Sequence, residues 1–183
     1  MDISKEQIKV LFTEQELQER ITEVAKQISQ DYKNSEELIV VGVLKGAAIF
    51  CSDLIRKLDL NCQLEFIRLS SYDSGTESSG KVKAYDLALP SLEGKDVLVV
   101  EDIIDSGRTA DFLMSFFQKQ AGVKSLKLAS LLDKPSRRLK EFESIKIDYT
   151  CFEIEDIFIL GYGLDYEQRF RELPYLGYVD GLV

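Results

Sequence analysis

The chain has 183 residues and a formal net charge of −9 at neutral pH, because 32 Asp and Glu side chains outnumber 23 Lys and Arg side chains. The length suits one domain with a full hydrophobic core, and the negative charge disfavours non-specific binding to a nucleic-acid backbone. The sequence contains no His, which excludes Ser-His and Cys-His catalysis and imidazole metal ligands. We therefore expect a single domain over residues 1–183 whose polar chemistry comes from carboxylates, Lys, Arg and Tyr.

The N-terminal segment Met1–Glu6 lacks a basic stretch followed by an apolar one, and the longest apolar run, Leu38–Leu44, is too short to span a bilayer. These features predict a cytoplasmic protein without membrane contact. The three cysteines, Cys51, Cys62 and Cys151, are widely spaced and embedded in apolar sequence. We expect buried free thiols at these positions rather than disulfides or a metal site.

The first half of the chain alternates predicted helices and strands. A capping box formed by Thr13 and Glu16 opens an amphipathic helix that we expect to end near Tyr32. Apolar runs bounded by polar residues then predict buried strands on either side of a second helix. The expected elements are a strand over Leu38–Leu44, a helix over 46–58 and a strand over 62–69. The polar stretch that follows, residues 70–80, contains one apolar residue, Tyr72, and is longer than ordinary connections in compact domains.

The second half continues the alternation. The β-branched and Leu run over Val97–Val100 predicts a strand covered on both faces. A helix over 109–121, a strand over 125–132 and shorter strands over 148–152 and 157–160 are expected to follow, before an aromatic segment over 162–178. Alternating strands and helices predict an α/β fold with a parallel sheet and right-handed crossovers.

The most informative segment runs from the strand at Val97–Val100 into two adjacent acids, Glu101 and Asp102, and a polar turn over Asp105–Thr109. In an open α/β sheet, ligands collect at the carboxyl ends of the strands. Backbone N–H groups around Gly107 and at the start of the next helix can hold a phosphate monoester. The two acids can accept hydrogen bonds from sugar hydroxyls or face a magnesium ion. The combination predicts a site for a phosphorylated sugar.

The same turn residues have a purely structural interpretation. Any tight strand-to-helix turn uses Asp, Ser, Gly and Thr, with Ser106 or Thr109 as the helix N-cap. The paired acids favour the functional interpretation, because two carboxylates at the end of a buried strand cost free energy unless a cation or hydroxyl groups compensate.

Two further strand ends carry cations. Lys45 and Gly46 follow the strand over Leu38–Leu44 and place an ammonium group at the same edge of the sheet, where pyrophosphate could bind or where the lysine could simply be solvated. Pro135 disfavours helical geometry at Lys134, so this lysine should be presented just past the end of a strand. The neighbouring Arg137 and Arg138 are expected to be solvated or to lie at a subunit contact.

Residues 101–109, with the sequence EDIIDSGRT, closely resemble the phosphoribosyl-diphosphate signature of the type I phosphoribosyltransferases, in particular of the hypoxanthine-guanine branch. Residues 131–138 (LLDKPSRR) and 161–166 (GYGLDY) resemble two further segments of this family, in the same order, and the resemblance extends from about Val40 to Arg171. It implies a central, mostly parallel twisted sheet flanked by helices, with a core over about residues 36–160. It also implies a small hood subdomain built from the chain ends.

The resemblance further implies an enzyme of purine salvage. Family members transfer the 5-phosphoribosyl group from 5-phosphoribosyl-1-diphosphate to N9 of hypoxanthine or guanine, giving IMP or GMP and pyrophosphate. They use Mg²⁺ and are commonly homodimers or homotetramers. The residues expected by resemblance to bind phosphoribosyl diphosphate are Glu101, Asp102, Asp105, Ser106, Gly107, Arg108 and Thr109, with Lys45, Gly46 and Arg171 at its pyrophosphate and Glu101, Asp102 and Asp165 as magnesium ligands.

For the purine, the resemblance implies that Asp105 approaches N7 as general acid/base and that Lys134 donates to O6. The ammonium group would distinguish a 6-oxopurine from adenine, whose amino group cannot accept that bond. Phe158 would stack on the ring and Ile159 would offer a backbone group to its edge. Without the resemblance, Phe158 and Ile159 would be interpreted as core strand residues.

Ser71 and Tyr72, in the polar stretch, resemble the family's mobile lid, which closes over the reacting centre and excludes water. Other classes of protein also remain open. A nucleotide-sensing RNA-binding regulator of the same fold would need a basic face, which the net charge disfavours. A transferase that uses adenine, orotate or uracil is disfavoured by Lys134, and a flavodoxin-like interaction domain would not need acids and a lysine at its strand ends.

Overall fold

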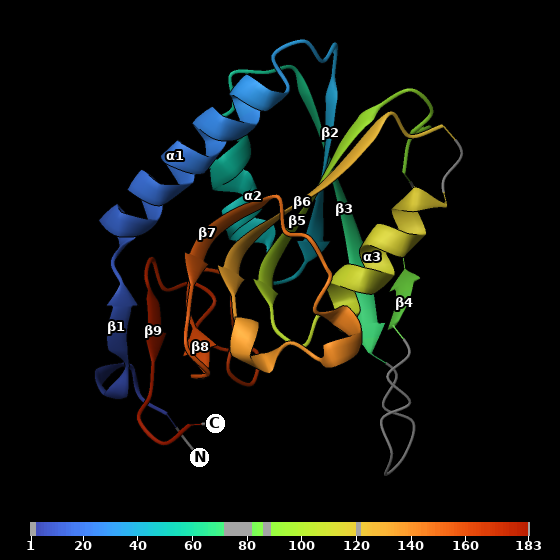
Figure 1. Ribbon diagram of the computed structural model, residues 1–183. Helices are drawn as coiled ribbons and strands as arrows, with labels where there is room; N and C mark the ends of the chain where they lie inside the picture. The colour runs from blue at the N-terminus through green and yellow to red at the C-terminus, as the bar shows by residue number, and fades with distance from the viewer. Residues whose placement is uncertain (1–2, 72–81, 86–88, 120–121, 183) are drawn as a thin grey trace.

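The computed structural model describes residues 3–71, 82–85, 89–119 and 122–182. A six-stranded sheet lies at the centre, in the order β4-β3-β2-β5-β6-β7 (Figure 1). All neighbouring strands are parallel except β4, which pairs antiparallel with β3 at the edge. The strands are β2 (Leu38–Leu44), β3 (Cys62–Ser71), β4 (Val82–Tyr85), β5 (Asp96–Ile104), β6 (Ser125–Asp133) and β7 (Tyr149–Glu153). The predicted α/β fold with a mostly parallel sheet is confirmed.

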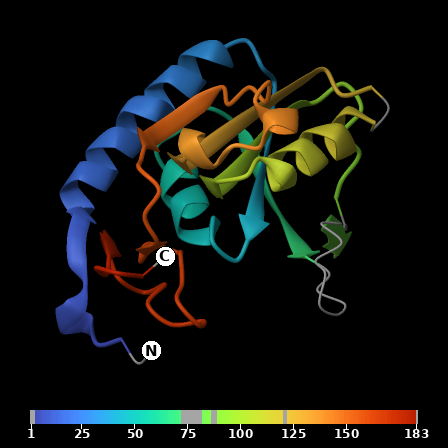
Figure 2. The same cartoon turned by 60° about the horizontal axis from the view of Figure 1, so that its bottom comes forward.

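Helices cover both faces of this sheet. Figure 2 shows α1 (Glu14–Asp31) and α2 (Ala48–Ile55) on one face and α3 (Arg108–Gln118) on the other. The capping box predicted for the first helix is present. Helix α2 is shorter than the predicted span over 46–58, because residues 46 and 47 form the turn after β2 and the last N–H groups make tighter i→i−3 bonds.

A second, small sheet joins the two ends of the chain. Strand β9 (Leu176–Tyr178) pairs antiparallel with both β1 (Lys9–Phe12) and β8 (Ile159–Leu160). This sheet lies beside the C-terminal end of the central sheet and carries the expected hood (Figure 1). Strand β8 is shorter than the predicted strand over 157–160. Short 3₁₀ helices complete the described elements: η1 (Lys5–Gln7), η2 (Pro135–Arg137) and η3 (Lys140–Phe142).

The core has two main layers, one on each face of the central sheet. Leu98 and Val100 of β5 pack in the layer of α1 and α2, whereas Val97 and Val99 pack in the layer of α3. Because successive strand residues point to opposite faces, both sets must be apolar, which explains the uninterrupted apolar runs. The same alternation determines where the acids after Val100 point.

Cys51 and Cys151 are buried free thiols, as predicted, whereas Cys62 is only partly buried. In the described part of the chain, no helix is both long and apolar enough to cross a membrane.

Candidate active site

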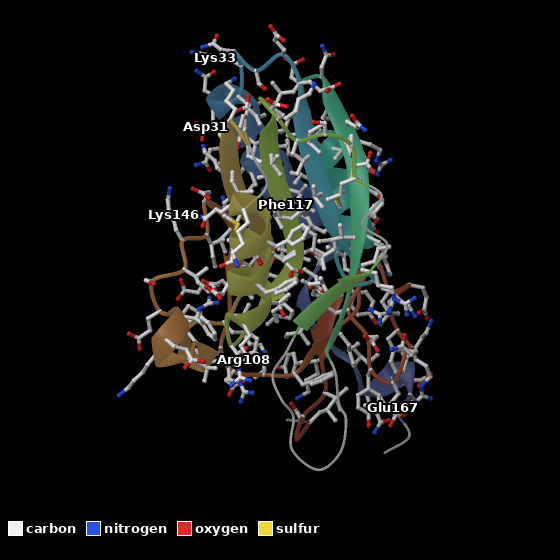
Figure 3. All side chains as sticks on the ribbon, turned by 90° about the vertical axis from the view of Figure 1, so that its right-hand side faces the viewer. Asp31, Lys33, Arg108, Phe117, Lys146 and Glu167 are labelled. Carbon is white, nitrogen blue, oxygen red and sulfur yellow. The ribbon has the colours of Figure 1, made fainter. Side chains whose placement is uncertain are left out.

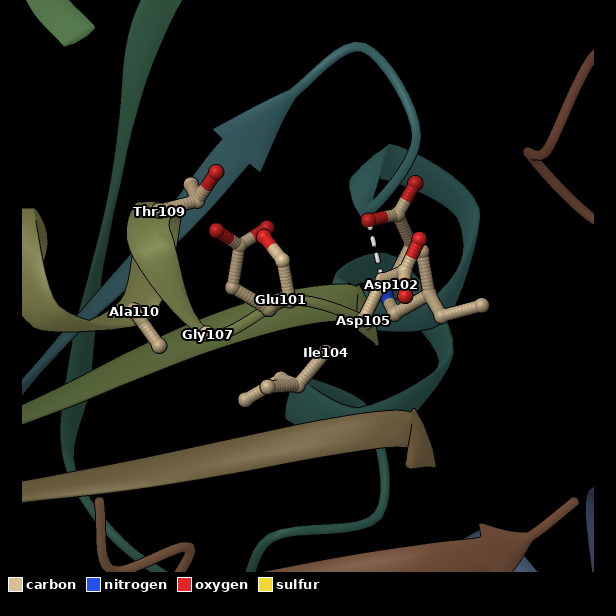
Figure 4. Close-up of a pocket in the computed structure, with 9 residues that line it drawn as sticks. Glu101, Asp102, Ile104, Asp105, Gly107, Thr109 and Ala110 are labelled. Carbon is tan, nitrogen blue, oxygen red and sulfur yellow. Dashed lines mark hydrogen bonds between the residues drawn. The ribbon is translucent and has the colours of Figure 1, made fainter. Parts of the chain in front are cut away.

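Strand β5 extends further than the sequence predicted. It runs to Ile104 because it stays paired with β6 through Ile103↔Leu132 and Ile104↔Asp133. The two acids therefore belong to the strand itself rather than to the turn beyond it, and their side chains point to opposite faces. Figure 4 shows the Glu101 carboxyl group directed towards the start of α3, where Thr109 lies, and that of Asp102 directed towards the connection between β2 and α2. The site lies at the end of the molecule that carries Arg108, opposite Asp31 and Lys33 (Figure 3).

Glu101 is buried, with 4% of its surface exposed, and its Oε1 atom has no hydrogen-bond partner. Burial, and then the neighbouring Asp102 carboxylate, raise the pKa of Glu101 well above its ordinary value. A buried carboxyl oxygen without a partner is costly. Glu101 is therefore a group that a ligand hydroxyl or a cation can satisfy.

The Asp102 carboxylate fills the space beside Gly46. A Cβ atom at Gly46 would lie 1.5 Å from Asp102 Oδ2, so this position has no room for a side chain. The other oxygen, Oδ1, accepts a hydrogen bond of 2.8 Å from the backbone N–H of Ile103. Burial raises the pKa of Asp102 to about 6, while Arg171 lowers it and Asp165 raises it. Gly46, predicted as a pyrophosphate-site residue, thus lies directly against a predicted metal ligand.

The raised pKa of Asp102 predicts how stability depends on pH. The folded chain releases this proton near pH 6 and the unfolded chain near pH 3.8, so the folded state holds more protons between these values. The free energy of unfolding should therefore fall as pH rises from about 4 to about 6, by up to about 3 kcal/mol for a shift of this size. Asp102→Asn should remove this part of the fall in urea unfolding curves. Equal pH slopes for the two proteins would contradict the assignment.

The turn after β5 forms a cavity of about 340 Å³, lined by residues 101–107 with Thr109 and Ala110. Gly107 is the N-cap residue of α3, with a φ of 90° that favours glycine. Ser106 Oγ accepts a hydrogen bond of 3.5 Å from the N–H of Arg108, the first residue of the helix. The structural alternative, in which Ser106 or Thr109 is the N-cap residue, is wrong about the residue at that position, although Ser106 bonds the first N–H of the helix. A Cβ at Gly107 would lie 2.8 Å from Cβ of Phe142. The segment after β6 thus packs directly behind this turn.

A second cavity of about 260 Å³ adjoins the first and shares Asp102, Ile103 and Asp105 with it. Its wall also contains four residues that the sequence singled out, together with the apolar Leu164. These four are Lys134, Phe158, Ile159 and Asp165. The structure therefore brings the predicted purine-site residues to the predicted phosphoribosyl site. The sequence did not mark Ile103 and Leu164 as lining residues. Ile103 directly follows Asp102, however, and Leu164 directly precedes Asp165.

Lys134 follows β6 directly and is buried, with 8% of its surface exposed. Its backbone is not helical (φ −114°, ψ 80°), as Pro135 predicts, and its N–H donates to the carbonyl oxygen of Ile104 over 2.9 Å. The ammonium group lies 3.9 Å from Oδ1 of Asp156. Phe158 meets the ring of Tyr166 edge-on, with 5.9 Å between ring centroids.

The expectation of a solvated side chain holds for Arg137 but is wrong for Arg138. Arg138 is not solvated: its side chain is 9% exposed and pairs with Asp133. Arg137 is half-exposed, but its Nε donates to Asp105 Oδ1 over 3.2 Å and its Nη1 lies 3.6 Å from Asp156 Oδ2. The sequence pattern of two adjacent basic residues gave no sign that one of them reaches the expected general acid/base.

The predicted pyrophosphate-side residues also converge. The peptide bond between Leu44 and Lys45 is cis, and Lys45 Nζ donates to Gln168 Oε1 over 3.0 Å. Arg171 Nη2 lies 2.6 Å from Asp165 Oδ1, so these two predicted site residues form an ion pair. Gln168 was not predicted as a site residue, because no motif marks it. Its backbone N–H donates to Asp165 Oδ2 over 2.8 Å.

Of the predicted lid, Ser71 is the last residue of β3, and Tyr72 lies outside the described residues. In the described ranges, no group of three or more acidic or cysteine side chains is arranged to hold a metal ion by itself. Asp102 and Asp165 nevertheless line the same cavity. This donor set suits Mg²⁺, which proteins usually hold through one or two carboxylates and the phosphates of a substrate.

Comparison with known proteins identifies the family of this chain. The family model of the phosphoribosyl transferase domain matches residues 8–167. The chain belongs to this family. Within it, the chain is 44% identical to a hypoxanthine-guanine phosphoribosyltransferase of Bacillus subtilis, over 92% of this chain and 91% of that protein. A crystal structure of a hypoxanthine-guanine phosphoribosyltransferase from Bacillus anthracis superposes with a TM-score of 0.86 and 43% identity, covering 93% of this chain and 98% of that one.

The chain is also 48% identical, over 92% of its length, to the bifunctional protein TilS/HprT of Listeria monocytogenes. It spans only 25% of that longer relative.

Proposed function

We propose that this phosphoribosyltransferase transfers the 5-phosphoribosyl group from 5-phosphoribosyl-1-diphosphate to N9 of hypoxanthine or guanine, giving IMP or GMP and pyrophosphate. The observation that carries the proposal is the pair of adjoining cavities, which share Asp102, Ile103 and Asp105. One cavity combines carboxylates with a helix N-terminus, and the other combines a buried ammonium group with aromatic and apolar walls. Relatives that match over nearly their full length carry the name of this activity.

The first cavity suits the phosphoribosyl group. Backbone N–H groups of the turn Asp105–Thr109 bind the 5-phosphate at the start of α3. Glu101, whose buried Oε1 has no partner, accepts a hydrogen bond from a ribose hydroxyl. Lys45 and Arg171 neutralise the departing pyrophosphate, because both cations lie on the side of the site where Gly46 approaches Asp102.

Mg²⁺ is the proposed cofactor, with Asp102 and Asp165 as its protein ligands. When bound, the metal ion lowers the negative charge that builds up on the pyrophosphate. Glu101 is a weaker candidate ligand than the sequence suggested, because its side chain points to the other face of β5 (Figure 4).

The second cavity suits the base. Lys134 donates to O6, Phe158 packs against the ring, and Ile159 presents backbone at the purine edge. Asp105 takes the proton from N7 as the N9–C1 bond forms and the bond from C1 to the pyrophosphate oxygen breaks. The proton that leaves the base therefore ends on Asp105, and the electron pair of the broken bond leaves with pyrophosphate.

The test is nucleotide formation from phosphoribosyl diphosphate and Mg²⁺ with hypoxanthine, guanine, xanthine or adenine in separate reactions, followed by chromatography. We expect nucleotide from the oxopurines and none from adenine, because an ammonium group facing the adenine amino group would leave two donors unpaired. Product from adenine alone would contradict the proposed substrate class. A folded protein that binds phosphoribosyl diphosphate but forms no nucleotide would instead favour the nucleotide-sensing regulator.

We further propose that residues 1–183 act as one domain and assemble into a homodimer or homotetramer. The cytoplasmic location stays a prediction.

A further inference from the structure

Asp156, in the connection between β7 and β8, lies between two cations of the segment that follows β6. Its Oδ1 atom is 3.9 Å from Lys134 Nζ, and its Oδ2 atom is 3.6 Å from Arg137 Nη1. Arg137 in turn donates through Nε to Oδ1 of Asp105. Charged groups therefore form a continuous series from Lys134 through Asp156 and Arg137 to Asp105.

Lys134 and Asp105, the two ends of this series, are held by the charged groups Asp156 and Arg137 between them. The Lys134 side chain is only 10% exposed, and in the described part of the chain Asp156 is the one acid within 4 Å of its ammonium group. A largely buried ammonium group needs such a counter-charge to keep its charge and its place. Arg137 engages one oxygen of Asp105, and the other, Oδ2, accepts no hydrogen bond from any residue that the structure describes. Asp105 is thus held by one oxygen with the second available.

Lys134 and Asp105 lie in the wall of the same cavity and can therefore contact the same edge of a bound purine. Lys134 and Asp105 both line the second cavity, and on a purine O6 and N7 are neighbouring atoms of one edge. We propose that Asp156 is a positioning residue that holds Lys134 at O6 and, through Arg137, Asp105 at N7. This inference rests on the proposed function and adds a residue that does not itself touch the substrate.

The test compares Asp156→Asn with Glu155→Gln, which removes the same charge from the exposed neighbouring residue. Asp156→Asn should raise KM for hypoxanthine and guanine about tenfold. KM for phosphoribosyl diphosphate should change by less than about twofold, because Lys134 and Arg137, the two cations beside Asp156, are not among the residues proposed to bind the pyrophosphate. Asp156→Glu should recover part of the loss, and Glu155→Gln should match the wild type.

Arg137→Gln removes the guanidinium group that links Asp156 to Asp105. This variant keeps the inference testable if Asp156→Asn folds poorly. It should lower kcat more than it changes either KM, and the double variant with Asp156→Asn should lose less than the product of the two single effects. Equal effects of Asp156→Asn and Glu155→Gln, or fully multiplicative effects in the double variant, would overturn the inference while leaving the proposed function intact. A wild type that forms no nucleotide in the same assay would overturn both.

Discussion

Replacement of Asp105 by Asn should lower kcat by about 100- to 10,000-fold. The amide keeps the size of the side chain and can still meet Arg137, whose Nε now donates to Oδ1 over 3.2 Å. It cannot take the N7 proton, so N9 would have to attack while the base still carries that proton. The dissociation constant of phosphoribosyl diphosphate should change little, because the proposed 5-phosphate site consists of backbone N–H groups of the turn and the start of α3. Steady-state kinetics together with equilibrium binding of phosphoribosyl diphosphate would measure both quantities.

Asp111→Asn is the matched control for this experiment. Asp111 is an exposed acid in the first turn of α3, on the same segment of chain. Its replacement changes the net charge equally and should leave kcat within about twofold of the wild type. If Asp105→Asn weakened phosphoribosyl diphosphate binding as much as it lowered kcat, the residue would be a ligand for the sugar phosphate and not a general acid/base.

Replacement of Lys134 by Met should reduce kcat/KM for hypoxanthine and guanine by about 10- to 100-fold, since a hydrogen bond from a charged donor contributes about 1.5–3 kcal/mol. Met keeps the length of the apolar stem in this buried position but has no donor for O6. The partner Asp156 stays hydrated, because 46% of its side chain is exposed. Discrimination against adenine should fall at the same time, because the variant no longer sets an ammonium group against the adenine amino group. Competition assays with pairs of bases would give the ratio directly.

Lys140→Met provides the comparison, because Lys140 is exposed and lies six residues further along the same connection. It should retain the wild-type preference for oxopurines. A Lys134→Met enzyme that lost activity on oxopurines but still rejected adenine as strongly as the wild type would show that Lys134 has no part in choosing the base.

The sequence alone determined the fold class, and its resemblance to a known family supplied the candidate site residues. Apolar runs such as Leu38–Leu44 and Val97–Val100 are too short for helices but suit strands that are buried on both faces. Such strands predict a parallel sheet with helices on each side. The segments 101–109, 131–138 and 161–166 were recognisable by their ordered resemblance to a known family, because the residue types of each segment taken alone also occur in ordinary turns. The convergence of the first two could be expected from the rule that parallel strands share a carboxyl edge, since they follow the neighbouring strands β5 and β6. The third follows β8 of the small antiparallel sheet, and only the fold brings it to the site.

Only the tertiary structure decided how the individual side chains are used. Because β5 stays paired with β6 as far as Ile104, Glu101 and Asp102 belong to the strand and their side chains point to opposite faces of the sheet. Packing behind Gly107 buried Arg138 and left its neighbour Arg137 to reach Asp105.

Gln168 meets Lys45 across 123 residues of chain, and no local pattern encodes such a contact. Backbone periodicity is a local property that a sequence displays directly. The partner of a charged side chain depends on which distant segments packing brings within a few ångströms of it, and that is decided only when the whole chain folds.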